Sequence, residues 1–444
     1  MAFRTSPTWS VLLLAAAGLF TQSAMAGPLT LMDAYDAALA NDATYRGAIY
    51  ANAAGQENRA LGRSGLLPSV SGSYSASKAH SDISYNGKDS PSQDYITRNA
   101  TVQLRQPLFS LDAWARYKQG GLQADYSSSL FLNEQQQVIV RVVGAYIEAL
   151  FKEDQLALAK IERDTYIERM KVNDRMFAKG EGTRTDMLET RARLDVAEAA
   201  LLEAQDNVVA TRTTLEQIIG APVTELSHLT PTFARRPADN LSFDDWRRVV
   251  IERNPEVKAK LIAVAIGDQE VLKARAGHTP RLDLVMSYGK ATSDTINTIN
   301  QDSTTRSVGI QLNVPFYSGG AVNASTRQAV ANREKAKADL QVETDKQLLE
   351  LRKDFDALSS SAARIEALTK AVESGRLLVT ATEQSIKGGV RINLDLLDAQ
   401  RLLTTTERDL AQARYTYVIS TLKMRAAAGT LSADDVRELS AQFR

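Results

Sequence analysis

Residues 281–288 read Arg-Leu-Asp-Leu-Val-Met-Ser-Tyr, and residues 308–314 read Val-Gly-Ile-Gln-Leu-Asn-Val. A large apolar side chain occupies every second position in both stretches, from Leu282 to Tyr288 and from Val308 to Val314. Successive side chains of a β-strand point to opposite faces of the sheet. The alternation therefore predicts two strands, each with one apolar and one polar face.

A second strand pair is expected earlier in the chain. Residues 96–104 alternate in a similar but weaker way, and a stretch rich in Ser, Tyr and Gly precedes them from about Val70. Long polar segments, 75–94 and 289–305, join the members of the two pairs. Their Ser, Thr, Asn, Asp and Gly content predicts surface loops.

The rest of the chain predicts long helices. Proline is absent from residues 108–221 and 316–444, and both tracts are rich in residues that favour helix. Helices are expected from about Asp112 to Lys179 and from Ala321 to Lys387, near 100 Å each at about 1.5 Å per residue.

Each long helix is expected to turn back on a partner. In the second tract apolar residues recur at spacings of three and four, which is typical of a coiled-coil seam, and resume after Gly388-Gly389. This predicts an antiparallel helix pair, and the first tract has the same design around residues 179–182. The seam comprises Leu351, Phe355, Leu358, Ala362, Ile365 and Val372, then Leu396, Ala399, Leu403, Thr406, Leu410, Ala413 and Tyr417.

The two halves of the chain are repeats. Short runs recur in the same order, and their drifting spacing indicates duplication with small insertions and deletions. We place the first repeat at residues 27–220 and the second at residues 241–429. The matching runs are Gly65 to Pro68 with Gly277 to Pro280, Gln103 to Pro107 with Gln311 to Pro315, Lys179-Gly180 with Lys387-Gly388, and Asp186 with Asp395.

The N-terminal residues predict export. Arg4 precedes a short apolar run, Val11 to Phe20, and a small-x-small cleavage site ends at Ala26, so residues 1–26 are interpreted as a signal peptide. The chain has no cysteine, which excludes disulfides, thiolate metal sites and a lipidated cysteine. Acidic and basic residues balance, 53 against 53, without long blocks, which argues against a nucleic-acid partner.

Strands with one apolar face, polar loops and an export signal fit a transmembrane β-barrel. One chain offers four such strands, and a barrel in lipid must close because open edges leave unpaired backbone groups. The chain must therefore oligomerise, giving eight strands for two chains or twelve for three. Helices near 100 Å long exceed a bilayer, so they are expected to form a hollow coiled-coil tunnel in the periplasm.

This arrangement and several local runs resemble the TolC family of outer-membrane channel proteins over nearly the whole mature chain. Singly the runs are weak, but they recur in order. They are Leu31 to Tyr35 with Asn41-Asp42, Leu67-Pro68, Arg105 to Phe109 followed by Trp114, Gly389 to Ala399, Leu410 to Tyr415, and Ala428 to Leu431.

The resemblance implies an α+β outer-membrane protein that forms a homotrimer, with a twelve-stranded barrel in lipid and a helical tunnel in the periplasm. It implies a mixed equatorial region built from the linker, residues 221–240, and the C-terminal segment, residues 430–444. It also implies docking to a periplasmic adaptor and to an inner-membrane ABC transporter or proton-driven pump that supplies the energy.

The second helix turn is the most informative candidate site. Asp395 and Asp398 lie three residues apart on one helical face. From the residues alone, two readings stay open: the acids complement the positive end of the helix, or they create a field that filters cations at an entrance. The resemblance implies the second, with acidic rings at a periplasmic aperture.

The resemblance also implies links that hold the aperture closed, at the positions of Arg391 and Asp186. Ile386 departs from the family pattern, in which a tyrosine joins this link, so the aperture is expected to be held less tightly or by other bonds. Gly180, Gly182, Gly388 and Gly389 are interpreted as turn formers. By the resemblance they also mark hairpin tips where an adaptor docks.

No constellation indicates catalysis or a cofactor. His80, His228 and His278 lack metal-ligand spacing, and neither a phosphate loop nor a nucleophile elbow is present. The main rival from another class is a periplasmic coiled-coil adaptor, which would not need amphipathic strands. If the protein is a channel, its cargo could be a protein or a small molecule. The resemblance favours protein secretion of the type I branch over small-molecule efflux.

Overall fold

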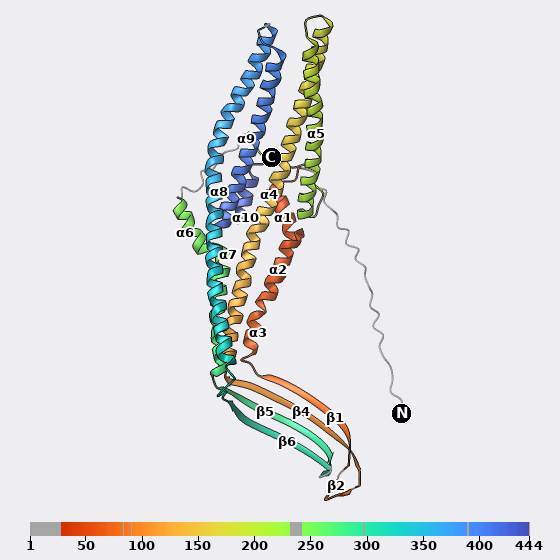
Figure 1. Ribbon diagram of the computed structural model, residues 1–444, viewed down its shortest axis with the longest axis vertical. Helices are drawn as coiled ribbons and strands as arrows, with labels where there is room; N and C mark the ends of the chain where they lie inside the picture. Colours follow the sequence, from red (N-terminus) through yellow and green to blue (C-terminus); the bar gives the residue numbers. More distant parts are fainter. Residues whose placement is uncertain are drawn as a thin grey trace, which may run out of the picture.

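The computed structural model describes residues 28–82, 84–89, 91–230, 242–295, 298–388 and 390–443. The protein is elongated, with two helical hairpins at one end and a curved sheet at the other (Figure 1). The predicted signal peptide, Gly389, Arg444 and residues 231–240 of the predicted linker lie outside the described residues.

Helices occupy most of the chain, in the order expected of two repeats. No helix among the described residues is long and apolar enough to cross a membrane. The helices of the first half are α1 (Leu31–Asn41), α2 (Ala43–Gln56), α3 (Asn58–Ser64), α4 (Leu111–Ala178) and α5 (Arg184–Ile219). Those of the second half are α6 (Phe243–Arg253), α7 (Pro255–Arg275), α8 (Ala321–Lys387), α9 (Asn393–Ala427) and α10 (Ala433–Ser440), with a short 3-10 turn, Ala276–His278, after α7.

The predicted strand pairs form one antiparallel sheet. Its strands are β1 (Ser69–Ser81), β4 (Gln93–Phe109), β5 (Arg281–Thr295) and β6 (Thr298–Asn313), in the order β1-β4-β5-β6. The two repeats meet where β4 pairs with β5. In one chain the outer edges of β1 and β6 have no neighbouring strand in the described sheet, as a barrel completed by further copies requires.

The predicted loops at 75–94 and 289–305 are wrong in extent. Most of these residues belong to the strands, and between β1 and β4 a small hairpin, β2 (Ser84–Tyr85) with β3 (Lys88–Asp89), caps the end. Cross-strand pairing explains the difference, because a ladder satisfies the backbone whatever the side chains are. The hydroxyl groups also bond across strands, with Ser77 and Thr97 Oγ atoms 2.7 Å apart and Ser287 and Ser307 Oγ atoms 2.7 Å apart.

Each strand of the sheet continues directly from or into a helix. β1 follows α3, β4 leads into α4, β5 follows α7 and β6 leads into α8 (Figure 1). The long helices α4 and α8 match the predicted ranges within about one residue, and each turns back antiparallel on α5 or α9.

The main core lies at the middle of the molecule. Residues of α4 from Val138 to Leu150 pack there against α1, α5, α9 and α10. The chain after α5 adds short bridges, Leu226 with Leu29 and Leu229 with Phe443, which bring the linker and the C-terminal segment together. The buried Tyr146 hydroxyl donates to the carbonyl oxygens of Leu29 at 2.7 Å and Ser227 at 3.0 Å.

The second hairpin uses the predicted seam. Leu351, Leu358 and Val372 of α8 are buried, as are five of the seam positions on α9. Helix α6 packs mainly against α8, and its Trp246 lies in one apolar cluster with Leu351 of α8 and Tyr417 and Met424 of α9. The five α9 positions are Leu396, Ala399, Leu410, Ala413 and Tyr417.

Candidate functional site

The free ends of the two hairpins carry every residue of the predicted aperture. At the first turn Gly180 has a φ of +75°, which a side chain would strain, and a Cβ on Gly182 would lie 3.1 Å from the backbone nitrogen of Phe177. Gly388, by contrast, has a φ of −82° and no close neighbour for a Cβ, so its conformation does not require glycine.

Asp186 is engaged within its own turn. Its carboxylate accepts hydrogen bonds from the Thr183 hydroxyl at 2.6 Å and the Thr183 backbone N–H at 3.2 Å, while the Thr183 hydroxyl accepts from the Asp186 backbone N–H. This reciprocal capping box starts α5. In one chain Asp186 therefore acts as a helix cap.

Arg391 and Asp395 lie together at the start of α9. The Arg391 guanidinium is 3.7 Å from the Asp395 carboxylate, four residues along the chain, and both side chains are more than a third exposed. No side-chain hydrogen bond caps α9, whose N-cap position is Ile392. Asp395 occupies the first turn, where its charge complements the helix dipole.

Asp398 makes one of the contacts that join the two hairpins near their tips. Its carboxylate accepts a hydrogen bond from the guanidinium of Arg193 on α5 at 2.9 Å. Glu189 of the same helix lies 3.7 Å from the Arg193 guanidinium, and Tyr166 of α4 also interacts with it. The Arg193 side chain is only 21% exposed. Burial lowers the pKa of Arg193, but the hydrogen bond and the charge of Asp398, together with Tyr166, outweigh burial, so the pKa is raised.

An apolar contact lies beside this ion pair. Leu397 of α9 is fully buried against Tyr166 of α4 and Leu194 and Ala197 of α5. Burial of one leucine stabilises the contact by about 1.5–3 kcal/mol. We name the contact between Leu397, Asp398 and the first hairpin the hairpin lock.

Further polar bonds extend the lock toward the tips. The buried Thr190 hydroxyl of α5 accepts from Asn173 Nδ2 at 2.8 Å and from Asn393 Nδ2 of α9 at 3.2 Å. Between α4 and α8, Arg169 donates to Glu383 at 3.2 Å. Ile386, one turn further toward the tip, is half-buried.

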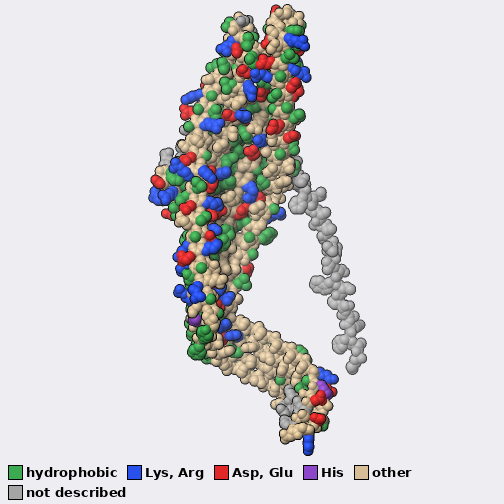
Figure 2. Space-filling model, in the orientation of Figure 1, with side chains coloured by type: hydrophobic (Ala, Val, Ile, Leu, Met, Phe, Trp, Pro, Cys, Tyr) green, Lys and Arg blue, Asp and Glu red, His purple; other side chains and the backbone are tan. Residues whose placement is uncertain are grey.

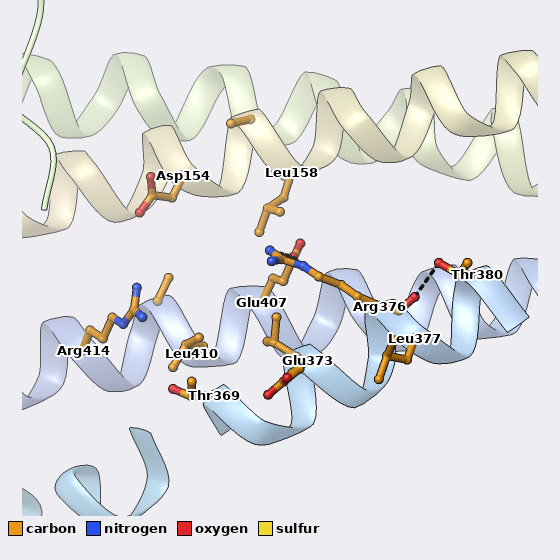
Figure 3. Close-up of a pocket in the computed structure, with 13 residues that line it drawn as sticks. Asp154, Leu158, Thr369, Glu373, Arg376, Leu377, Thr380, Glu407, Leu410 and Arg414 are labelled. Carbon is orange, nitrogen blue, oxygen red and sulfur yellow. Dashed lines mark hydrogen bonds and ion pairs between the residues drawn. The ribbon is translucent and has the colours of Figure 1, made fainter. Parts of the chain in front are cut away.

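A cleft separates the hairpins between the lock and the main core. It has a volume of about 730 Å³, with α4 on one side and α8 and α9 on the other (Figure 3). On the α8–α9 side Arg376 of α8 bonds Glu407 of α9 at 2.7 Å, while Asp154 faces the cleft from α4. The hairpins therefore touch at the core and at the lock, with a gap between.

The described ionisable groups away from the hairpin ends do not meet the requirements of a metal site. Among residues with described positions, no group of three or more His, Asp or Glu side chains is placed to hold a metal ion. His80 pairs with Asp94 at 3.0 Å near the strand tips, and His228 lies 3.6 Å from both Glu153 and Asp154. His278 contacts Asn323 at 3.1 Å.

The sequence analysis did not identify Arg193, Thr190, Tyr166 or Leu397. Nothing in the local sequence distinguishes Arg193, because its partner lies on another hairpin. Leu397 did carry a signal: it follows Leu396, and adjacent residues of a helix lie about 100° apart, so both cannot face one seam. The second leucine indicated a second buried face on α9.

Comparison with known proteins identifies the family. The pattern of the family described as outer membrane efflux protein matches residues 34–221 and again residues 246–430, one match in each repeat. The chain belongs to this family. It is 40% identical to the alkaline protease secretion protein AprF of Pseudomonas aeruginosa over 94% of this chain and 87% of that protein. It is 37% identical to the proteases secretion protein PrtF of Dickeya chrysanthemi, over 93% and 91%.

Solved structures share the fold. The Campylobacter jejuni CmeC outer membrane channel aligns with a TM-score of 0.79 at 18% identity, covering 93% of this chain and 90% of that one. CusC aligns with a TM-score of 0.79 at 14% identity. The protein is thus an outer-membrane exit duct, whose trimer closes a twelve-stranded barrel on a periplasmic helical tunnel, one of the two assemblies that the strand count allowed.

Proposed function

We propose that the duct serves type I protein secretion, receiving an exported protein from an ABC transporter through a periplasmic adaptor. The observation that carries this is the likeness to two protease secretion proteins, at 40% and 37% identity over nearly the whole chain. The likeness to the Escherichia coli outer membrane protein TolC is lower, 26% over 85% of this chain.

Complementation tests the proposal. The chain is expressed in a Pseudomonas aeruginosa strain without AprF, and extracellular protease is measured beside a lysis marker. Restored secretion supports the proposal. Failure to restore secretion, combined with restored growth in organic solvent of a strain without its efflux duct, would replace it by small-molecule efflux. A chain with the sheet intact but residues 390–398 deleted is the negative control.

The aperture is gated, in our proposal, by the second hairpin moving against the first. The hairpin lock supports this because it is weak enough to break. An exposed ion pair contributes about 0.2–1 kcal/mol, and Leu397 about 1.5–3 kcal/mol, per protomer. Because the cleft leaves few contacts between the lock and the core, loss of the lock frees most of the α8–α9 hairpin.

Arg391 is proposed to bond a carboxylate of a neighbouring protomer in the trimer. Its guanidinium is half exposed and holds Asp395 only loosely, at 3.7 Å, so it is available for a second partner. Single-channel conductance in planar bilayers tests this: Arg391→Ser is expected to raise conductance. Unchanged conductance in Arg391→Ser, with intact trimers, would remove this residue from the gate.

The acidic pair is proposed to attract cations at the entrance, mainly through Asp395. Asp398 is already paired with Arg193, which cancels most of its charge. Asp395→Ala is therefore expected to lower cation selectivity and block by multivalent cations more than Asp398→Ala does. Equal effects of the two substitutions would contradict the larger role of Asp395. If neither substitution changes selectivity or block, the acidic pair does not attract cations at the entrance.

The hairpin tips are proposed to receive the adaptor. Val390 and Ile392 are 81% and 61% exposed beside the second turn, and Leu188 is 61% exposed beside the first. Apolar side chains at an exposed tip are typical of a surface that binds another protein. Val390→Asp is expected to abolish protease secretion while leaving conductance unchanged; secretion at the wild-type level would place the adaptor elsewhere.

A further inference from the structure

The charged residues of the sheet are sorted between its two faces. By the register of the strands, even-numbered residues of all four strands share one face, which we name the apolar face. Odd-numbered residues share the other face, the odd face, which lines the lumen; the base of the sheet is its end next to the helices. The odd face carries mainly Ser, Thr, Asn and Gln. Figure 2 shows one face of the sheet whose middle part has few apolar or charged side chains, while charged side chains gather at its tip. The cations of the odd face, Arg105 and Arg281, lie only at the base, where both bind Asp283.

Four cations lie on the apolar face, one on each strand. They are Lys78 of β1, Arg98 of β4, Lys290 of β5 and Arg306 of β6. All four are exposed, and within the described ranges none has a carboxylate within ion-pair distance. Arg306 lies over the ring of Tyr288 at 5.7 Å. Among the side chains that the structure describes, two acids share this face nearer the tip. Each already has a bond: Asp302 accepts from the Thr292 hydroxyl at 2.7 Å, and Asp94 pairs with His80 at 3.0 Å.

The cations follow the upper border of the apolar band. Arg306 pairs with Tyr288, Lys290 with Ala100, and Arg98 with Ala76. On this face Arg306, Lys290 and Lys78 lie directly beyond the last apolar residue of their own strands, whereas Arg98 follows Ala100 and has Ile96 beyond it toward the tip. From β6 through β5 and β4 to β1, the cation on each successive strand lies two residues nearer the tip of the sheet. Strands of a membrane barrel tilt by about 35–45°, so an inclined line across the ladder becomes a ring at one height.

The position of this ring identifies what it faces. The helices are periplasmic, so the hairpin ends of the strands point away from the cell. The stretch from Leu282 to Lys290 spans about 26 Å along the strand, which at this tilt is about 20 Å across the membrane, close to the apolar band of about 25 Å in membrane barrels. Phe316 and Tyr317, 92% and 88% exposed, lie beyond the opposite border, after β6. The cations therefore lie at the headgroups of the outer leaflet.

We propose that Lys78, Arg98, Lys290 and Arg306 bind the phosphate groups of the phosphorylated glycolipid of the outer leaflet. Phosphate pairs with Lys and Arg through charge-assisted hydrogen bonds. A ring of unpaired cations at one height, above tyrosines, complements a leaflet whose headgroups carry phosphate on a sugar. The odd face has no such ring: above the base its strand residues carry no charge. The apolar face, which contacts lipid, is basic at its border.

Binding of lipid to the purified trimer in detergent tests the proposal. The probe is diphosphoryl lipid A, and the variant is Lys290→Gln with Arg306→Gln. Loss of two surface cations is expected to weaken binding by roughly tenfold at low salt, and wild-type binding is expected to weaken in 0.5 M salt by a similar factor. The matched control, Arg247→Gln with Lys258→Gln, removes two exposed cations outside the sheet and is expected to bind like the wild type.

Each other outcome overturns the proposal. Equal binding by the double variant and the wild type would show that the ring holds no phosphate. Equal binding of lipid A without phosphate would assign the contact to the acyl chains. Equal binding of phosphatidylglycerol would replace the glycolipid by any anionic lipid. If the double variant does not form trimers, the salt dependence of the wild type decides, and binding that is independent of salt contradicts the ring.

Discussion

The first hairpin, α4 with α5, and the second, α8 with α9, descend from one duplicated unit but are held differently. Residues of α4 from Val138 to Leu150 are almost wholly enclosed in the main core. The α8 helix has a comparable length, yet its buried apolar residues among the described positions are few and widely spaced. The α4 helix is thus anchored by one continuous buried stretch, whereas α8 is anchored at separated points.

The turn of the first hairpin also has more stabilising contacts than the turn of the second. The first has a left-handed Gly180, a tightly packed Gly182 and the Thr183–Asp186 capping box. At the second, the described residues provide no side-chain cap for α9. The two repeats therefore hold their hairpin turns with different contacts, and in the proposed gating the second hairpin is the one that moves.

Core packing is expected to show the largest difference between the hairpins. Leu150 and Leu351 are both fully buried, the former in the main core. Leu150→Ala is expected to lower the free energy of unfolding by about 3 kcal/mol and Leu351→Ala by about 2 kcal/mol, because the smaller cluster relaxes more easily around a cavity. Denaturant unfolding of the trimer measures both. An equal or larger loss for Leu351→Ala would contradict the looser packing of the second hairpin.

The lock is expected to give the next largest effect. Arg193→Gln removes a bond worth about 1 kcal/mol per protomer and should raise single-channel conductance several-fold. Adding Asp398→Asn should change little more, because both substitutions remove one interaction. Arg191→Gln is the matched control, since Arg191 lies on the same helix but pairs with Asp195 at 3.1 Å. Additive effects of Arg193→Gln and Asp398→Asn would show that the two residues are not coupled.

Helix capping sharpens the contrast between the turns. Thr183→Ala removes the capping box of α5 and is expected to cost about 1 kcal/mol of stability. The converse change, Ile392→Ser, gives α9 a side-chain acceptor that it lacks and is expected to add about 0.5 kcal/mol. Hydrogen exchange of the amides in the first turn of each helix measures both locally. Slower exchange in Thr183→Ala would refute the role of the box.

A half-buried acid in the second hairpin is expected to give the smallest effect. Burial raises the pKa of Asp354 on α8 to about 6 from an ordinary 3.8, and the nearby Lys423 does not offset it. The folded state therefore binds more protons, and stability falls as pH rises from about 4 to 6. Asp354→Asn is expected to gain below about 1 kcal/mol at pH 7 and nothing near pH 3. A gain that is independent of pH would assign the effect to another cause.

Much of this architecture is local and could be read from the sequence. The alternation in β5 and β6, the absence of proline from α4 and α8, and the seam of the second hairpin each report a periodicity of the backbone. The need for several chains followed from the strand count. The one error in the sheet, the length of the loops, arose because polar residues disfavour no strand once a neighbour pairs with their backbone.

The duplication also determined which residues gather at the hairpin ends, so Asp395, Asp398, Arg391 and Asp186 were all placed there by sequence. What each of them does depends on neighbours far along the chain. Asp186 turns inward to cap α5, while Asp398 reaches Arg193 on the other hairpin. Periodicity places a side chain on a face of its own helix, whereas its partner depends on how two hairpins pack, and only the tertiary structure brings such distant residues within bonding distance.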